Sequence, residues 1–318
     1  MQEKSLKIVF LDLKTMGEVP NLHLLEKYGE VKYYQNTAPD ETPGRIKDAD
    51  IVITNKVDIN KPALEAAAKL KLICVAATGT NNVDKEAAAQ RGIPVKNAVD
   101  YSSASVAQLT FALLLHLLHK LPYFDNYVKQ GEYSQSDIFT HLENPFREIK
   151  GKRFGIIGLG NIGRQVARIA EAFGAEVVYF SASGGNTEQP YQRLELKEFL
   201  GTSDIVSIHA PLNQYTQNLL HYDQLRLMKP SAILLNMGRG GIVNEADLAR
   251  ALDENLIYAA GLDVFAQEPI EKDNPLLKIK NKEKLVLTPH IAWASVEART
   301  LLVEKVAQNI QEFLQENK

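Results

Sequence analysis

The fold of this 318-residue chain can be predicted from one stretch, Arg153-Phe154-Gly155-Ile156-Ile157-Gly158-Leu159-Gly160-Asn161-Ile162-Gly163. Its first five residues form an apolar run of strand length, and its last six have the spacing G-x-G-x-x-G. Apolar residues then recur at helical spacing from Arg164 to Phe173, and Gly174 ends that helix before a second strand at residues 176–181. The stretch therefore predicts one complete βαβ unit.

The three glycines of this unit indicate a binding site for a nucleotide pyrophosphate. Gly158 permits a tight turn, Gly160 lets the backbone approach a phosphate, and Gly163 allows helix and strand to pack closely. Asn161 and Ile162 lie where the helix N-terminus offers free N–H groups to an anion. The spacing alone also occurs in plain turns, but the flanking strand and helix favour a dinucleotide site.

The end of the second strand bears on the choice between NAD and NADP. An acidic residue normally stands there to bind the ribose hydroxyls of NAD. Here the strand runs into Ser181-Ala182-Ser183-Gly184-Gly185-Asn186, without a carboxylate. Ser181, Ser183 and Asn186 can bond a hydroxyl or a phosphate, and the nearest arginine, Arg193, lies well down the loop. The missing acid argues against strict NAD dependence, and both coenzymes stay open.

Outside this unit, short apolar runs alternate with helical patterns in two series. Helices are expected at residues 21–28, 61–69, 84–91 and 296–314. Strands are expected at residues 7–13, 50–54, 72–77 and 93–97, and then at 153–157, 176–181, 205–209, 232–236, 260–264 and 285–287. This alternation predicts an α/β protein with two parallel-sheet domains.

Two consecutive segments interrupt the alternation. Residues 102–119 are apolar on nearly every face, which predicts a helix buried on most sides, between two domains or two subunits. Residues 122–150 are polar and aromatic without a clear period. We expect them to form a loop-rich excursion that contacts a second subunit.

The composition excludes several classes of protein. Hydrophobic residues make up 45% and charged residues 24%, which is ordinary for a globular chain, and the net charge of −3 predicts no nucleic-acid partner. We expect no metal site, because the seven histidines are scattered, and no signal peptide or membrane span. Cys74, the single cysteine, lies in an apolar run and predicts an inert buried thiol in the cytoplasm.

Three segments in the last third each follow an apolar strand, so we expect them at the edge of the sheet where ligands bind. Arg239 stands between glycines, and its planar guanidinium suits a carboxylate. Asp263 ends the next strand and can accept a hydrogen bond from a nicotinamide carboxamide. Glu268 is a candidate partner for a histidine, and His290 follows the last strand. Each alone is more often a turn or core residue, but together they suit hydride transfer to a 2-oxo acid.

These motifs resemble those of the D-isomer-specific 2-hydroxyacid dehydrogenase family. The resemblance covers almost the whole chain and is strongest at residues 158–163, 209–212, 236–240, 262–269 and 289–290. Within the family, residues 77–84, 105–113 and 290–294 are most similar to glycerate dehydrogenases, also called hydroxypyruvate reductases.

The resemblance implies a catalytic set of Arg239, Glu268 and His290, NAD or NADP as cofactor, and a homodimer. It also implies a split, flavodoxin-like substrate-binding domain, residues 1–100 and 290–318, around a Rossmann-type dinucleotide-binding domain, residues 101–289. Substrate contacts are expected from Thr78, Gly79, Arg239 and Trp293. Coenzyme contacts are expected from Gly158, Gly160, Asn161, Ile162, Gly163, Ser181, His209, Ala210, Pro211, Met237, Gly238 and Asp263.

The expected reaction is hydride transfer between a nicotinamide and a small 2-oxo acid, with hydroxypyruvate and D-glycerate as the expected pair. Alternatives within the class are glyoxylate, a lactate-type substrate and 3-phosphoglycerate, although no basic cluster stands beside Thr78 and Gly79 to bind a phosphate. The alternative from another class is a nucleotide-sensing binding protein that resembles a co-repressor.

Overall fold

The computed structural model describes residues 5–185, 187 and 189–317 of the chain. Contacts between Cα atoms divide it into two compact units. Unit 1 comprises Met1–Ser102 and Trp293–Lys318, and unit 2 comprises Ser103–Ala292. The sequence places these boundaries at residues 100/101 and 289/290.

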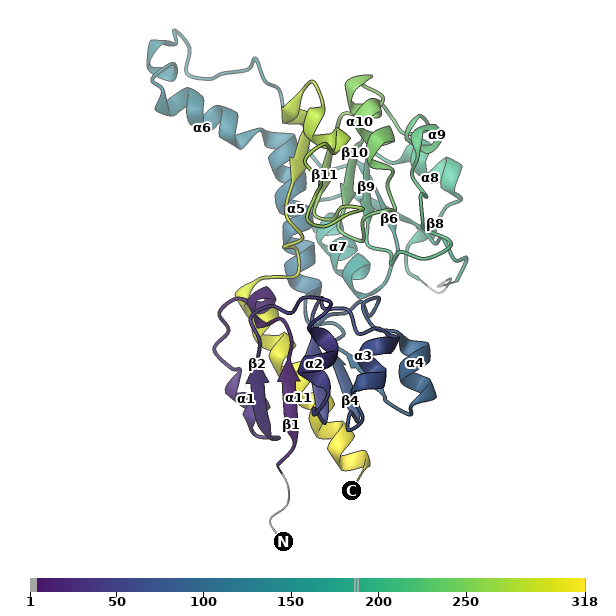
Figure 1. Cartoon of the computed structure of the whole chain (residues 1–318). Coiled ribbons are helices and arrows are strands. Elements are labelled where there is room, and N and C mark those ends of the chain that lie inside the picture. The colour runs from purple at the N-terminus through teal and green to yellow at the C-terminus, as the bar shows by residue number, and fades with distance from the viewer. Residues whose placement is uncertain (1–4, 186, 188, 318) are drawn as a thin grey trace. The chain divides into compact units, whose positions relative to one another are not determined.

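Unit 1 is built on a five-stranded parallel sheet of order β2-β1-β3-β4-β5 (Figure 1). Its strands are β1 (Lys7–Phe10), β2 (Glu30–Tyr33), β3 (Ile51–Thr54), β4 (Leu72–Val75) and β5 (Val95–Asn97). This order is that of flavodoxin-like folds, in which the winding reverses between the first and third strands. The inner strands are apolar throughout because helices cover both faces of the sheet.

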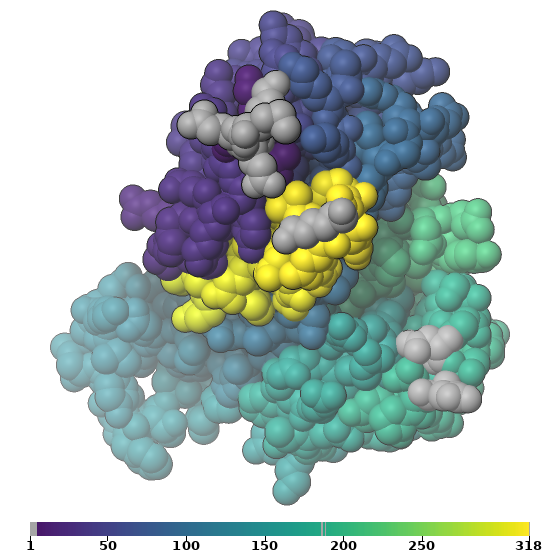
Figure 2. Space-filling model, turned by 90° about the horizontal axis from the view of Figure 1, so that it is seen from below, coloured from purple at the N-terminus to yellow at the C-terminus, as the bar shows by residue number. Residues whose placement is uncertain are grey.

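Helices from both ends of unit 1 share one face of its sheet. Leu25 of α1 (His23–Glu26) and Leu302 of α11 (Val296–Glu316) lie in one core with Ile8 and Ile53. Figure 2 shows α11, in yellow, against the N-terminal residues of the unit. The opposite face is covered by α2 (Thr42–Ile46), α3 (Lys61–Ala66) and α4 (Lys85–Gln90).

Unit 2 is built on a seven-stranded parallel sheet of order β12-β11-β10-β9-β6-β7-β8. Its strands are β6 (Arg153–Ile157), β7 (Glu176–Phe180), β8 (Gln192–Arg193), β9 (Ile205–Ile208), β10 (Ile233–Asn236), β11 (Ala259–Leu262) and β12 (Leu285–Leu287). The winding reverses between β6 and β9. The glycine-rich turn after β6 therefore lies at the switch point where such sheets bind ligands.

Helices cover both faces of this sheet as well. One face packs against α5 (Ser103–His119) and α7 (Asn161–Ala172), and the other against α8 (Leu196–Thr202), α9 (Tyr222–Leu225) and α10 (Glu245–Asp253). The short 3₁₀ helices are η1 (Leu13–Met16), η2 (Tyr133–Gln135), η3 (Pro275–Lys278) and η4 (Lys282–Lys284). The apolar surface of α5 is explained by its contacts with α7 and with strands β10, β11 and β12.

The structure corrects the sequence-based elements in several places. Residues 121–129, expected in a loop, form α6 (Leu121–Lys129), a helix without a buried residue. Strands β2 and β8 were not predicted, because β2 is only half-buried and β8 has two residues. The helix of the fingerprint begins at Asn161, not at Arg164.

Among the described residues, no single helix is long and apolar enough to cross a membrane. Helices α5 and α6 reach the required length and hydropathy only as a pair, and they meet at a bend of 56°. Eight residues of α5 are buried, and seven of them belong to the hydrophobic core of unit 2.

Candidate active site

The turn after β6 has the close contacts that the glycine pattern predicts. Gly158 has φ +90°, and a Cβ there would lie 2.7 Å from the backbone nitrogen of Ala210. A Cβ at Gly163 would lie 2.3 Å from the carbonyl oxygen of Gly158, so α7 begins directly against the turn. A side chain at either position would push the strand, the turn and the helix apart.

Gly160 contrasts with its two neighbours, because a Cβ there would meet nothing within 4 Å. The space beside Gly160 is therefore open at the N-terminus of α7, where unpaired N–H groups favour an anion. Arg164 adds a positive charge in the first turns of α7, and its Nη2 donates to Asn161 Oδ1 at 2.6 Å. These residues fit a pyrophosphate.

The other segments predicted to contact a coenzyme meet this turn at the same edge of the sheet. His209, Ala210 and Pro211 follow β9, and the backbone N–H of His209 donates to Ile157 O at 2.8 Å. Met237 and Gly238 follow β10, and a Cβ at Gly238 would lie 2.7 Å from Ala210 O. The structure thus brings residues 158–163, 209–211 and 237–238 together.

His209 is neutral in this environment. Its Nε2 lies 2.8 Å from Ser207 Oγ, and its Nδ1 is buried without a hydrogen-bond partner among the described residues. Burial lowers the pKa of His209 to about 3, because a desolvated imidazole disfavours its charged form. The expected contact between His209 and a coenzyme stays a prediction.

Arg239 is held on its turn by the buried Asn236, which ends β10. Asn236 Oδ1 accepts from the N–H of Gly238 at 3.1 Å, and its Nδ2 donates to Arg239 O at 3.0 Å. The guanidinium donates through Nη1 to Gly238 O at 2.8 Å and forms no ion pair within the described part of the chain. The other N–H donors of the Arg239 guanidinium remain for an anionic ligand.

Contacts between loops connect Arg239 to the other two predicted catalytic residues. A Cβ at Gly240 would lie 1.8 Å from Phe265 O, so the Arg239 turn lies directly against the loop after β11. In that loop, Glu268 Oε1 accepts from the N–H of Phe265 at 3.0 Å. Glu268 Oε2 lies 2.7 Å from Nδ1 of His290. The three side chains therefore come from loops in mutual contact.

The backbone of His290 adopts an unusual conformation. Its φ is +55°, in the left-handed region that non-glycine residues occupy at a cost of about 1–3 kcal/mol. The N–H of His290 donates to Asp263 O at 2.8 Å. The surrounding loop holds this conformation, which orients the imidazole toward Glu268.

Asp263 holds the His290 loop in place. Its side chain is buried, and its Oδ1 accepts from Thr288 Oγ1 at 2.6 Å and from the N–H of Ile291 at 2.9 Å. Its Oδ2 accepts from the N–H of Ala292 at 2.8 Å. Burial raises the pKa of Asp263, and these hydrogen bonds partly offset that effect. The expected contact between Asp263 and a nicotinamide carboxamide stays a prediction.

Two residues outside the predicted site also hold its loops in place. Asn236 holds the Arg239 turn, and Thr288 pairs with Asp263 beside His290. A signal for Asn236 was present, because an Asn that ends a strand commonly bonds the backbone two residues later. Nothing local pointed to Thr288, because its partner lies 25 residues away.

The remaining site predictions concern unit 1 and the loop after β7. Thr78 and Gly79 follow β4, and Trp293 packs edge-on against Tyr101 with ring centroids 6.4 Å apart. All of these belong to unit 1, and their substrate contacts stay predictions. Ser181 donates from Oγ to Gly185 O at 2.7 Å, whereas Asn186 lies outside the described residues.

Two other sequence predictions concern metals and the single thiol. Among residues 5–185, 187 and 189–317, no group of three or more His, Cys, Asp or Glu side chains can hold a metal ion. Cys74 is buried, and burial raises the pKa of its thiol to about 12. This thiol is therefore unreactive at neutral pH.

The fold and the site define a nicotinamide-dependent dehydrogenase, and comparisons with known proteins agree. Residues 111–292 match the model of the D-isomer specific 2-hydroxyacid dehydrogenase NAD binding domain. A hydroxypyruvate reductase from Blautia hydrogenotrophica is 38% identical, with 91% of each chain covered. A glycerate dehydrogenase from Methylorubrum extorquens is 37% identical, covering 97% of this chain and 96% of that protein.

A solved structure shows the same likeness in three dimensions. An acyclic imino acid reductase in complex with NADPH and D-Arg is similar with a TM-score of 0.87, 31% identity and 98% of each chain covered. The chain described here belongs to the D-isomer specific 2-hydroxyacid dehydrogenase family. It is an NAD(P)-dependent oxidoreductase, and its two α/β units, each with a doubly wound parallel sheet, confirm the predicted fold class.

Proposed function

We propose that this enzyme interconverts hydroxypyruvate and D-glycerate, with unit 1 as the substrate-binding domain and unit 2 as the dinucleotide-binding domain. The observation that carries the proposal is the 2.7 Å contact between Glu268 and His290, beside the turn that presents Arg239. The similarity to a hydroxypyruvate reductase and a glycerate dehydrogenase favours this substrate pair.

His290 is the proposed general acid for reduction. The coenzyme that residues 158–163 would hold would supply hydride-transfer chemistry at the carbonyl carbon of the substrate. His290 donates a proton from Nε2 to the substrate oxygen, and Glu268 accepts from Nδ1. This hydrogen bond orients the ring, so that Nε2 faces the substrate oxygen in the proposed complex. In the reverse direction the neutral imidazole takes the proton back.

Arg239 is the proposed anchor for the substrate. Its planar fork matches two oxygens, so it can hold the substrate carboxylate and polarise the reacting carbonyl oxygen. Backbone N–H groups at Thr78 and Gly79 are proposed to bind the same carboxylate, with Trp293 beside the substrate. The predicted coenzyme contacts of His209, Met237 and Asp263 belong to the same proposal.

Initial rates with a panel of 2-oxo acids test this function. Hydroxypyruvate, glyoxylate, pyruvate and 3-phosphohydroxypyruvate are each supplied with NADH and with NADPH, and the loss of reduced-nicotinamide absorbance is followed. We expect the highest kcat/KM with hydroxypyruvate. A higher value with another acid would reassign the substrate. Tight nucleotide binding without any turnover would instead favour the binding protein that resembles a co-repressor.

The homodimer belongs to the same proposal, with the arm, residues 121–149, as the contact between two copies. Helix α6 and the loop after it extend away from the sheet of unit 2 (Figure 1). The arm exposes Phe139 at 89% and Leu142 at 74%, together with Ile138 and Phe146. Exposed apolar side chains at this density are typical of a protein interface.

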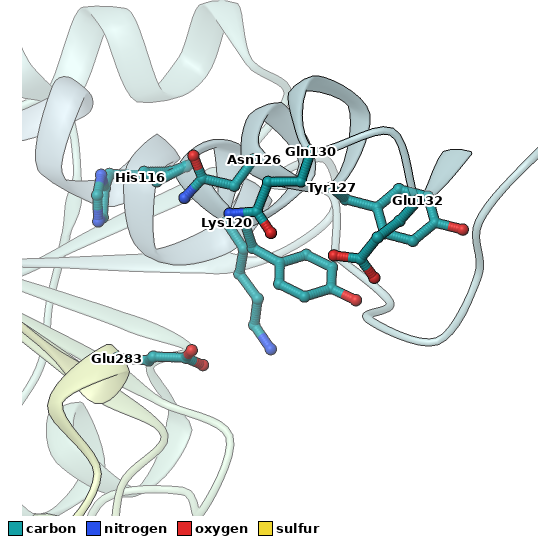
Figure 3. Close-up of a pocket in the computed structure, with 9 residues that line it drawn as sticks. His116, Lys120, Asn126, Tyr127, Gln130, Glu132 and Glu283 are labelled. Atoms are coloured by element: carbon teal, nitrogen blue, oxygen red, sulfur yellow. The ribbon is translucent and has the colours of Figure 1, made fainter. Parts of the chain in front are cut away.

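A groove beside the arm is the proposed binding site for the arm of a second copy. It has a volume of about 410 Å³ and lies between α6 and η4. Figure 3 shows Lys120 and Glu283 extending into it from its two sides. Tyr123 and Tyr127 contribute aromatic lining, which suits an apolar occupant that carries polar groups at its ends.

Sedimentation velocity on the whole chain tests the dimer. We expect the mass of a dimer, and the double variant Phe139→Asp with Leu142→Asp should sediment as a monomer with an unchanged melting temperature for each unit. A monomeric parent protein would refute the arm as an interface.

The cytoplasm is the proposed location, because a buried free thiol at Cys74 suits a reducing compartment.

A further inference from the structure

The corner of unit 2 at the end of β7 bears on which coenzyme the dinucleotide site accepts. Ser181 follows β7 directly, and the N–H of Gly158 donates to Phe180 O at 3.3 Å. The end of β7 therefore lies beside the glycine-rich turn. In Rossmann domains an acid at this position binds the ribose 2′-hydroxyl of NAD, whereas a nearby arginine accommodates the 2′-phosphate of NADP.

Strand β8 brings an arginine to this corner. It pairs in parallel with β7, with Arg193 opposite Tyr179, two residues before Ser181. Arg193 Nη1 donates to Gly184 O at 3.0 Å, so its guanidinium lies against the loop that follows Ser181. In the sequence Arg193 is twelve positions after Ser181, and strand pairing removes that separation.

The described residues of this corner carry positive charge without a compensating acid. Residues 181–185 are Ser-Ala-Ser-Gly-Gly. Arg193 forms no ion pair with a described residue, and its Nε is buried without a hydrogen-bond partner there. A guanidinium in this state is stabilised by an anion that accepts from its remaining donors.

We infer that Ser181 and Arg193 make this enzyme bind NADPH more tightly than NADH. The planar fork of Arg193 matches phosphate oxygens, and Ser181, whose hydroxyl donates to Gly185 O, places no negative charge where a 2′-phosphate would bind. NADH finds no carboxylate among residues 181–185 to hold its ribose hydroxyls. A charge-assisted contact of this kind corresponds to about a ten- to hundredfold difference in Kd. The inference rests on the dinucleotide site after β6.

Equilibrium titration of the whole chain with NADPH and with NADH, followed by reduced-nicotinamide fluorescence without substrate, tests this inference. The two ligands differ only by the 2′-phosphate. We expect at least about a tenfold lower Kd for NADPH, with the advantage shrinking as salt is added. Arg193→Gln should raise the Kd for NADPH about tenfold and leave that for NADH within twofold.

Two further variants make the test specific. Ser181→Asp leaves Arg193 in place and should reverse the preference, because its carboxylate binds the ribose hydroxyls and repels a 2′-phosphate. Arg168→Gln is the matched control for charge, since Arg168 is an exposed arginine of α7 whose Nη1 donates to Gln165. We expect it to change neither Kd. Melting temperatures within about two degrees of the parent show that each variant is folded.

Equal affinities, or tighter binding of NADH by the unaltered chain, would overturn the inference. It would also be overturned if Arg193→Gln kept the full advantage of NADPH, or if Arg168→Gln removed that advantage. Binding of neither coenzyme would refute the dinucleotide site itself and the inference with it, whereas turnover of the wrong 2-oxo acid would affect only the proposed substrate.

Discussion

The two parallel sheets have a buried carboxylate that holds a loop at their carboxyl edges, and only in unit 2 does that loop carry the proposed catalytic histidine. In unit 1, the buried Asp12 follows β1 and accepts from the N–H groups of Asn55, Lys56 and Val57, in the loop after the neighbouring strand β3. In unit 2, the buried Asp263 follows β11 and holds the loop after its neighbour β12.

Both carboxylates are buried, and burial raises the pKa of each. What differs is the loop that each one holds, because the loop of Asp263 contains His290 and lies against Glu268. The buried acid is therefore a way to fix a loop on a parallel sheet. In the proposed mechanism, proton transfer depends on the side chain that the loop presents, His290.

Removing the reacting groups should have the largest effect. We expect His290→Ala to lower kcat/KM about 10²–10⁴-fold, because general acid catalysis is lost. Arg239→Ala should cost as much. Coenzyme affinity measured by fluorescence is the control, since neither change touches the turn after β6. Near-normal turnover by His290→Ala would show that another group supplies the proton.

Substituting the two buried acids, Asp12 and Asp263, separates the effect of holding a loop on stability from its effect on turnover. Asp263→Asn and Asp12→Asn each place an amide NH₂ against backbone donors, and we expect each to lower the unfolding free energy by about 1–3 kcal/mol in urea titrations. Only Asp263→Asn should also lower kcat by about tenfold or more, because it displaces His290. Equal losses of kcat in both variants would contradict a specific link between Asp263 and His290.

Glu268→Gln should have a smaller effect than loss of the imidazole. The amide still contacts Nδ1 but accepts a weaker hydrogen bond than a carboxylate does, so the ring is held less firmly and we expect a loss of about tenfold in kcat for reduction. Initial rates with hydroxypyruvate measure this loss, and a kcat equal to that of the parent would contradict the orienting role of Glu268. Glu271→Gln, in the same loop and exposed, is the control and should leave kcat unchanged.

The smallest expected effect concerns stability in acid. Burial lowers the pKa of His209 to about 3, so the folded protein binds fewer protons than the unfolded chain between pH 6.5 and 3. The stability that neutral His209 contributes is thus present above pH 6.5 and is lost as the pH falls through this range. The free energy of unfolding is measured in urea at pH 8 and at pH 5. From pH 8 to pH 5 it should decrease by up to about 2 kcal/mol more in the parent than in His209→Asn.

Features that depend on local pattern could be predicted from the amino-acid sequence. The G-x-G-x-x-G turn, the apolar strands and the position of Arg239 and His290 after strands follow from hydrophobic periodicity and from the conformations that glycine allows. Periodicity did not reveal α6 or β2, because the helix buries no residue and the strand is half-buried.

Which strand ends lie next to one another became clear from the folded structure. Sheet order places β10, β11 and β12 side by side, so that Gly240 contacts Phe265 and Glu268 reaches His290 across 22 residues of sequence. In the same way, the pairing of β8 with β7 places Arg193 near the end of β7, although a loop separates the two in the sequence. Such contacts depend on the register of distant strands, which nothing in a short window of sequence encodes.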